Sequence, residues 1–335
     1  MRILVTGAGA GPAISIIKAL KAWDRDPERI VVATDMNGDA AGFMLADQCV
    51  ITPATTAADF VPALLKACSD HHIEMVIPIL DADAAALSAA ADMFCVAGTA
   101  VATHTPQTIR QCSDKLLAYQ LCLTSGIRQP VSFSGPGDTP DEAFPILAKP
   151  RRGVSARGIM VFPNRPAAMP FVDTPGDLLW QRLVQGQEFS IDTFSRPSLG
   201  DFVAVPRRRD IVKAGQMVRG ETCADPQLVA FAAECCEAFG LTDVACIQVI
   251  REVRSNELFF IEANPRYGTG VSLSIAAGVF FPRLQHLRNV LRKQIPAAFL
   301  KFQPGVRMAR FWEEIYELPD SRTKVVGLGR LRPPG

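Results

Sequence analysis

The chain has 335 residues, of which 48% are hydrophobic and 21% charged, a composition typical of globular proteins and unlike disordered or fibrous ones. A net charge of +1 gives no global electrostatic basis for binding nucleic acid or an acidic membrane surface. Glycine interrupts the first residues too early for a signal peptide, and no apolar run approaches the roughly 18 residues of a membrane helix. We therefore expect a soluble, cytoplasmic protein of two or three small domains.

Residues 1 to about 104 alternate short apolar strands with helical segments. The predicted strands cover 2–7, 29–35 and 74–80, and the predicted helices cover 12–23, 57–68 and 81–94. This alternation predicts an α/β domain with a doubly wound parallel sheet. One long helix is expected next, with Thr105 as its N-cap, Pro106 at its first position and Gly126 at its end.

The pattern changes from about residue 127, where proline and glycine become frequent. Short strands are predicted at 145–150, 158–163, 177–184, 188–194, 201–206 and 209–215, and helices at 225–239 and 280–294. This half indicates antiparallel α+β structure. The last residues have no helical or strand periodicity, and we expect a loose tail there.

A glycine-rich turn follows the first predicted strand. Gly7, Gly9 and Gly11, with Asp35 ending the second strand, suggest a dinucleotide site in which backbone N–H groups approach a pyrophosphate. The third glycine of the GxGxxG pattern, however, is replaced by Pro12. The match is therefore weak, and a tight turn without a cofactor is the favoured interpretation.

A second loop fits phosphate better. Lys149 ends the strand PILAKP and precedes RRGVSARG, which contains Gly153, Ser155 and Gly158. An ammonium group beside free backbone N–H groups can hold triphosphate oxygens. About thirty residues later, Gln181 and Glu188 flank a glycine turn, where a strand edge can read adenine and a carboxylate can bind a ribose diol. An exposed basic turn and a solvated glutamate are the alternatives.

The stretch LFFIEANPRYGTG places polar side chains at the end of an apolar strand. Side chains alternate along a strand, so Glu262 and Asn264 should share one face while Ile261 and Ala263 point into the core. The preceding strand, VACIQVI, carries Gln248 in an otherwise apolar run. If the two strands pair, the three polar side chains converge.

Three oxygen-bearing side chains with one carboxylate fit a hard cation that keeps phosphate ligands, as Mg²⁺ does. Arg266 lies just beyond the strand, within reach of phosphate oxygens. The alternative is a strand-terminating turn in which Glu262 pairs with Arg266.

With these residues in place, the sequence resembles the ATP-grasp superfamily, and within it the single-module proteins similar to the large subunit of carbamoyl phosphate synthetase. The resemblance covers roughly residues 1 to 318. It implies a pre-ATP-grasp domain at 1–113, a small lid with its leading helix at 114–185 and a large subdomain at 186–320, with 321–335 left as the tail. The implied cofactors are ATP with Mg²⁺ or Mn²⁺.

The resemblance also implies roles for individual residues. The phosphate-side residues would be Lys115, Lys149, Ser155 and Arg266, with Lys149 and Arg266 taking part in catalysis. Adenine would meet Gln181 and the backbone at Leu183, and ribose would meet Glu188. The metal ligands would be Gln248, Glu262 and Asn264. Two departures stand out: the flexible loop is poor in glycine, and the first metal ligand is a neutral glutamine.

The implied activity is that of a carboxylate–amine ligase acting through an acylphosphate on small-molecule substrates. Carbamoyl phosphate synthesis is not expected, because that enzyme joins two such modules, and the chain looks short for a biotin carboxylase. A homodimer is plausible from the family. Substrate contacts are expected from the basic run of Arg207, Arg208, Arg209 and Arg219, from Asp83 of an Asp81/Asp83 pair, and from Ser272 in GTGVSLS.

Each of these substrate candidates has a simpler explanation. The arginines can form a solvated face, and the aspartates can cap a helix. Two other functions stay open. One is an NAD(P)-dependent oxidoreductase that uses the N-terminal sheet, and the other is a non-catalytic ATP-binding protein.

Overall fold

The computed structural model describes residues 1–22, 28–153, 157–172, 177–317 and 324–326. They form two compact units, each described by itself. The first comprises Met1–Thr103, Pro282–Gln294 and the described residues from Met308 onward, and the second comprises His104–Phe281 and Ile295–Arg307. Among the described residues, no helix combines the length and apolar character needed to cross a membrane.

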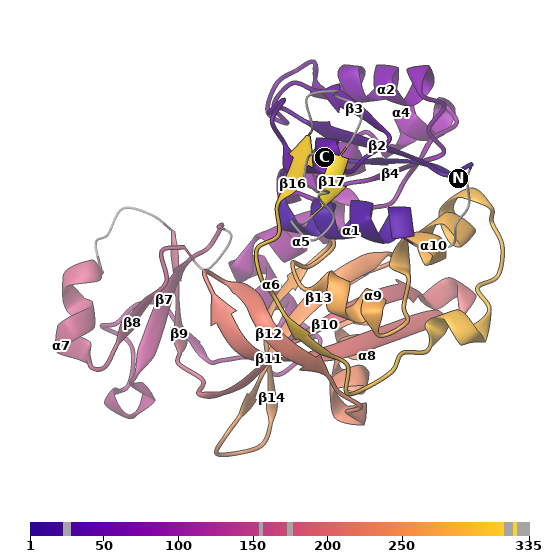
Figure 1. The fold of residues 1–335 in the computed structure, drawn as a ribbon. Coiled ribbons are helices and arrows are strands. Elements are labelled where there is room, and N and C mark those ends of the chain that lie inside the picture. Colours follow the sequence, from indigo (N-terminus) through magenta and orange to yellow (C-terminus); the bar gives the residue numbers. More distant parts are fainter. Residues whose placement is uncertain (23–27, 154–156, 173–176, 318–323, 327–335) are drawn as a thin grey trace, which may run out of the picture. The chain divides into compact units, whose positions relative to one another are not determined.

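The first unit is built on a five-stranded parallel sheet of order β3-β2-β1-β4-β5. Its strands are β1 (Arg2–Val5), β2 (Ile30–Asp35), β3 (Gln48–Ile51), β4 (Met75–Ile77) and β5 (Ala100–Val101). Its helices are α1 (Gly11–Ala22), η1 (Ala41–Met44), α2 (Phe60–Asp70), α3 (Asp81–Ala89) and α4 (Ala91–Val96). Helices α1 and α2 lie on opposite faces of the sheet (Figure 1), which confirms the doubly wound α/β prediction.

Three features of this unit differ from the sequence prediction. Strand β3 is largely exposed and β5 has only two residues, so neither carries the apolar signal of a buried strand. The helix predicted at 81–94 is two helices that meet at Ala90. The helix predicted at 280–294 is shorter, with α10 (Phe281–Gln285) followed by the π-helical turn η5 (His286–Val290).

The described part of the expected C-terminal tail is not irregular. Lys324–Val326 form β17, which pairs antiparallel with β16 (Ile315–Glu317). The rest of 321–335 lies outside the described residues.

The second unit contains a four-stranded antiparallel sheet of order β6-β9-β7-β8. Its strands are β6 (Ser132–Phe133), β7 (Ile146–Pro150), β8 (Met160–Phe162) and β9 (Leu178–Arg182), accompanied by η2 (Asp141–Ala143), α7 (Arg165–Ala168) and η3 (Met169–Phe171). Trp180 and Phe162 pack at its core, with ring centroids 5.6 Å apart. Strands β7, β8 and β9 match the predicted segments.

The larger sheet of this unit has the order β14-β13-β10-β11-β12-β15. Its strands are β10 (Gly186–Arg196), β11 (Asp201–Lys213), β12 (Gln216–Thr222), β13 (Val244–Glu252), β14 (Leu258–Asn264) and β15 (Arg307–Ala309), with η4 (Pro197–Leu199), α9 (Val271–Ala276) and η6 (Ala297–Leu300) alongside. The two strands predicted at 201–206 and 209–215 are one long strand, β11, and β12 has no predicted counterpart.

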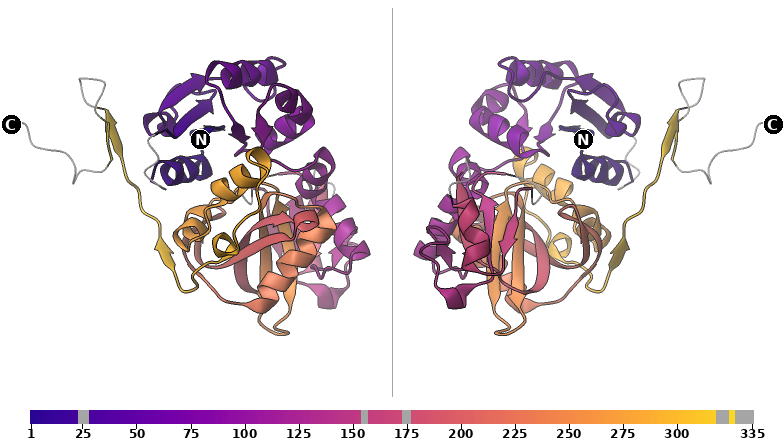
Figure 2. Two further views of the ribbon diagram at one scale, coloured as in Figure 1. Left: turned by 90° about the vertical axis from the view of Figure 1, so that its right-hand side faces the viewer. Right: turned by 90° about the vertical axis from the view of Figure 1, so that its left-hand side faces the viewer.

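One face of this large sheet is apolar and covered by helix α8 (Pro226–Phe239), as Figure 2 shows. Phe189, Ile191, Ile247 and Phe260 belong to that core. Because side chains alternate, the neighbouring positions of the same strands point to the other face. That second face carries the polar residues of the candidate site, so the core fixes their orientation.

The long helix expected after Thr105 is interrupted. It forms α5 (Pro106–Ser113) and α6 (Lys115–Thr124), separated by Asp114 in an extended conformation. Thr105 does cap α5, where its hydroxyl accepts a hydrogen bond from the Thr108 N–H. The carboxylate of Asp114 caps α6 by accepting from the N–H groups of Leu116 and Leu117, and this second cap places Lys115 at the first turn of a new helix.

Candidate functional site

Four polar residues distant in sequence line one cavity of the second unit. Lys115 comes from α6, Lys149 from β7, Gln181 from β9 and Glu262 from β14. Apolar side chains complete the wall, among them Ala118 and Phe260 of the core beneath. Gln129 also lines it, so the cavity brings two cations, two amides and one carboxylate against an apolar floor.

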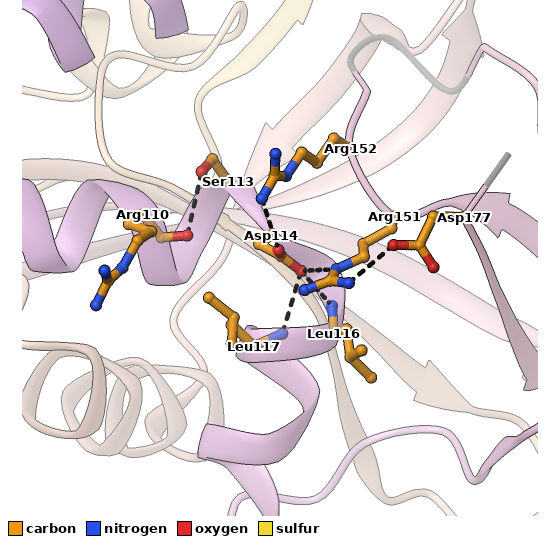
Figure 3. A network of polar contacts seen from close by, with 8 residues as sticks. All are labelled: Arg110, Ser113, Asp114, Leu116, Leu117, Arg151, Arg152 and Asp177. Carbon is orange, nitrogen blue, oxygen red and sulfur yellow. Dashed lines mark hydrogen bonds and ion pairs between the residues drawn. The ribbon is translucent and has the colours of Figure 1, made fainter.

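A network of hydrogen bonds and ion pairs surrounds Asp114, between the elements that carry the two lysines (Figure 3). The guanidinium of Arg151 lies just past β7, and its Nε donates to Asp114 Oδ1 at 2.6 Å while its NH1 donates to Asp177 at 2.8 Å. The Lys115 N–H also bonds to the Arg151 carbonyl. Because Asp114 caps the helix that starts at Lys115, one carboxylate ties that helix to the end of the Lys149 strand.

Lys149 is unusually buried for a lysine, with 8% of its surface exposed. The pKa of its ammonium group is lowered to about 8, chiefly by burial; the Glu262 carboxylate opposes this shift and the positive charge of Lys115 adds to it. A buried cation of this kind needs negative partners. One carboxylate does not fully meet that need, so the cavity favours an anionic ligand.

The predicted adenine side of the site belongs to the small sheet. Gln181 is buried, and its Nε2 donates to the Ser132 hydroxyl at 2.9 Å. The N–H of Leu183 donates to the Pro145 carbonyl at 3.0 Å, so it is already used within the protein. Glu188 is half exposed, with Oε2 3.4 Å from the Arg209 guanidinium. Ser155 lies outside the described residues.

The predicted convergence on the large sheet is present. Gln248 of β13 lies directly opposite Glu262 of β14. Gln248 Nε2 and Asn264 Nδ2 both donate to Glu262 Oε1, at 2.7 and 2.9 Å. A bulge after this pair changes the expected alternation: Phe260 and Ala263 reach the core, whereas Ile261 is half-buried and lines the cavity with Glu262.

Arg266 follows the strand end as expected. Its NH2 donates to Asn264 Oδ1 at 3.3 Å and its NH1 to the Tyr267 carbonyl at 3.1 Å. Its guanidinium thus continues the row of polar groups that begins at Gln248. Glu262 and Arg266 therefore do not form the direct ion pair of the alternative interpretation. Asn264 lies between them, because it donates to Glu262 and accepts from Arg266.

The donor chemistry of this row suits a hard cation only in part. Among the described residues, no group of three or more His, Cys, Asp or Glu side chains is arranged to hold a metal ion. The single carboxylate of Glu262, together with the Asn264 amide oxygen after that amide turns, fits a cation completed by phosphate oxygens. Gln248 is less suited than Glu262 to bind this cation, because its Oε1 already accepts a hydrogen bond from Arg209 at 2.6 Å.

The structure corrects the expectation for Arg207. This side chain is 1% exposed, and its NH2 pairs with Asp192 Oδ1 at 2.7 Å. Ser274 of α9 donates to the other oxygen of the same carboxylate at 2.6 Å. A side chain at Gly270 would collide with the guanidinium, so the loop lies directly on it. Arg207 holds the loop after β14 against the sheet and is not open to a substrate carboxylate.

Two other substrate candidates of the second unit, Arg219 and Ser272, do not line the cavity. Arg219 is exposed on β12, and Ser272 is half-buried in α9. Asp83 belongs to the first unit, in the first turn of α3. It does not cap that helix; its carboxylate accepts from the hydroxyls of Thr6 and Thr55, at 2.7 and 2.5 Å. Burial raises the pKa of Asp83.

The glycine-rich turn of the first unit is held by its own residues. Asp35 accepts from the Gly9 N–H at 2.8 Å through Oδ2 and from the Asn37 N–H at 2.9 Å through Oδ1. Gly42 packs so closely on the Ala8 carbonyl that a side chain would clash. The acid that the dinucleotide interpretation assigns to a ribose thus accepts hydrogen bonds from the turn itself.

Sequence reasoning missed two residues of the polar face and its frame, Asp114 and Asp192, and it named Arg209 only as one of four arginines in a basic run. If β11 is treated as one strand, alternation along RRRDI places Arg209 and Arg208 on opposite faces of the sheet. Asp114 could have been found as a potential cap in the middle of a predicted helix. Asp192 carried no signal beyond being an acid in an apolar strand.

Comparisons with known proteins agree with this fold. Residues 174–312 match the family model described as ATP-grasp in the biosynthetic pathway with Ter operon, and residues 3–102 match the PylC-like N-terminal domain. No curated protein matches the sequence significantly.

Several solved structures share the architecture at low sequence identity. The biotin carboxylase–β,γ-ATP complex of Campylobacter jejuni is 15% identical, with a TM-score of 0.70 over 90% of this chain and 73% of that one. A biotin carboxylase domain dimer of Hydrogenobacter thermophilus 2-oxoglutarate carboxylase, solved with MgADP and bicarbonate, is 16% identical, with a TM-score of 0.68 over 92% and 72%. The L-amino acid ligase of Bacillus licheniformis is 16% identical, with a TM-score of 0.66 over 90% and 77%.

Proposed function

Residues 174–312 of this chain belong to the ATP-grasp family, and from this membership we propose that the protein is an ATP-dependent carboxylate–amine ligase. The observation that carries the proposal is the convergence of Lys115, Lys149, Gln181 and Glu262 on one cavity. Two cations and a carboxylate beside an apolar wall suit the triphosphate and base of ATP with a divalent cation. Relatives of this fold were solved with ATP-type ligands and MgADP.

The chemistry divides into two displacements. An oxygen of the substrate carboxylate attacks the γ-phosphorus, the bond to the β-phosphate oxygen breaks, and ADP leaves with an acylphosphate formed. The amine then attacks the acyl carbon, phosphate leaves with the C–O bonding electrons, and the nitrogen loses a proton. The product is an amide or a peptide bond.

The residues of this chain contribute charge and position. Lys115, Lys149 and Arg266 neutralise phosphate oxygens as charge moves onto them, which is where most of the catalysis of phosphoryl transfer arises. Glu262 and Asn264 would hold Mg²⁺, which supplies further neutralisation of the phosphates when bound. Gln181 faces the base and Glu188 the ribose. No side-chain nucleophile is needed in either displacement.

A release assay tests the proposal directly. ADP formation from Mg-ATP is measured with pooled small carboxylates and amines for the wild type, Glu262→Ala and Glu257→Ala. The second variant is the matched control, because Glu257 lies on the same hairpin but pairs with Arg128 at the surface. Substrate-dependent release that survives in Glu257→Ala and disappears in Glu262→Ala is expected. Equal release from all three proteins contradicts the proposed site.

The two alternative functions give different results. A non-catalytic ATP-binding protein would be stabilised by Mg-ATP in a thermal-shift assay but release no ADP with any pool. An oxidoreductase would be stabilised by NAD(P)H instead. Self-association as a homodimer is tested separately by light scattering of the purified chain.

A further inference from the structure

Arg209, predicted only as one arginine of a basic run that contacts substrate, is a buried cation at the centre of the polar face. Its side chain is 5% exposed, although an arginine is seldom buried without partners. NH1 donates to Gln248 Oε1 at 2.6 Å, and NH2 donates to the Gly215 carbonyl at 2.9 Å. Its Nε lies 3.4 Å from Glu188 Oε2.

The sheet geometry explains how Arg209 reaches Gln248. Strand β10 lies between β11 and β13, and the residue of β10 opposite Gln248 is Ser190. Strands β11 and β13 are therefore two strand spacings apart, about 10 Å, and the side chains of Arg209 and Gln248 must both extend across β10 to meet. The small side chain of Ser190 leaves room above β10 for that contact.

These contacts fix the orientation of the Gln248 amide. Its Nε2 donates to Glu262 Oε1 at 2.7 Å while its oxygen accepts from Arg209. Turning the amide over would set its N–H groups against a guanidinium and its oxygen against a carboxylate. Neither new pair can form a hydrogen bond, because arginine has no acceptor and an ionised carboxylate has no donor. The oxygen of Gln248 is therefore held toward a permanent cation.

A divalent cation on that oxygen would lie close to the guanidinium and be repelled by it. Glu262 offers a different environment. Within the described residues its second oxygen, Oε2, accepts no hydrogen bond, and Asn264 lies beside it. The Asn264 oxygen also accepts from an arginine, but its contact with Arg266 NH2 is 3.3 Å long, against 2.6 Å between Arg209 and Gln248, so the Asn264 amide is held less firmly. Only this end of the row presents a carboxylate oxygen to an incoming metal.

We propose that Arg209 supplies the fixed positive charge of this site, so that the nucleotide complex takes a single divalent cation on Glu262 and Asn264. Gln248 is then a positioning residue that orients Glu262, and it is not a metal ligand. The inference rests on the proposed function, because it assumes that the cavity binds ATP.

Counting bound Mn²⁺ tests it without any need for turnover. Mn²⁺ is titrated into wild-type protein saturated with a non-hydrolysable ATP analogue, and free Mn²⁺ is followed by its paramagnetic resonance signal. One Mn²⁺ per bound nucleotide is expected. Two would overturn the inference and leave the proposed function intact, whereas absence of nucleotide binding would overturn both.

Variants isolate the role of Arg209. The double variant Arg209→Gln/Gln248→Glu removes the guanidinium and adds a carboxylate, and we expect it to bind two Mn²⁺ per nucleotide. Gln248→Glu alone should still bind one, because Arg209 pairs with the new carboxylate. Arg208→Gln is the matched control: Arg208 points to the opposite side of β11, pairs with Asp210 and Glu221, and should leave the count at one. A folded double variant that also binds one would show that Arg209 does not set the number.

Discussion

Both compact units carry acidic side chains near the ends of apolar strands or in the helical turn that follows, but the two sets of acids have different surroundings. In the first unit, each oxygen of Asp35 and Asp83 accepts a hydrogen bond from a backbone N–H or a hydroxyl of the unit itself. In the second unit, Glu262 Oε1 accepts from two amides, and the carboxylate faces the buried ammonium of Lys149 across a cavity.

The difference teaches that a glycine-rich turn followed by an acid is not by itself a nucleotide site. The turn at Gly7–Gly9 has the right residue types, yet its acid is used to close the turn. The site in the second unit has few glycines but places uncompensated charge around a cavity. The two regions differ less in their sequence motifs than in whether their charged side chains already have partners within the protein.

The largest expected effect comes from removing the buried charge. Lys149→Met should weaken binding of a non-hydrolysable ATP analogue by about 100-fold, since a charge-assisted contact to phosphate is lost. The same change should raise the melting temperature of the ligand-free protein, because a lysine whose pKa is lowered by burial costs stability when charged. Calorimetric titration and thermal unfolding measure the two effects. A variant that loses both affinity and stability would contradict this account.

The pH dependence gives the next effect. Lys149 must be charged to hold phosphate, so kcat/KM for ATP should fall about tenfold per pH unit above pH about 8. Stability should change in the opposite direction. Between pH about 8 and 10.5 the unfolded chain binds more protons at this residue, so its contribution to the free energy of unfolding rises with pH.

Lys149→Arg provides the control for the pH profile, because a guanidinium stays charged over this range. Residual activity in that variant should show no decline between pH 8 and 10. A decline identical to that of the wild type would assign the titration to another group.

Loss of the Asp114 carboxylate should lower stability by a moderate amount. Burial raises the pKa of Asp114, but its bonds to Arg151 and to two N–H groups outweigh this and hold the pKa below its usual value. Asp114→Ala should therefore lower the free energy of unfolding by about 2–3 kcal/mol in urea titrations. Thr105→Ala removes a cap without an arginine partner and should cost about 1 kcal/mol. Equal losses would mean that the arginine contributes nothing.

A small effect is expected in the first unit from Asp83→Asn. The amide keeps the size of the side chain and can bond to both threonine hydroxyls, so the free energy of unfolding should change by less than about 1 kcal/mol. Nucleotide affinity should be unchanged. The expectation that Asp83 contacts a substrate is tested in the same variant, since a tenfold rise in KM for the amine would support it.

No effect is expected from nicotinamide cofactors. NADH and NADPH should leave the melting temperature unchanged, because Asp35 is already bonded to Gly9 and Asn37. A rise of several degrees with either cofactor, lost in Asp35→Ala, would restore the dinucleotide interpretation of the first unit.

Local patterns predicted much of the fold. Apolar strands alternating with helices identified the parallel sheet, which the topology confirms, and β7 to β10 were located to within two or three residues. The misses share a cause. Strands β3, β5 and β12 offer apolar runs of at most three residues, and the prediction divides β11 because arginines interrupt its apolar pattern.

The sequence by itself determined the chemistry at the end of β14: the spacing of Glu262, Asn264 and Arg266, and the presence of Gln248 one strand earlier, follow from residue order and strand alternation. Tertiary structure alone decided which side chains remain available. Arg207 and Arg209 lie two residues apart on one face, yet one is sealed under Gly270 by Asp192 and the other reaches Gln248. The reason is physical: burial and hydrogen-bond partners come from strands and loops distant in sequence, and no local pattern records them.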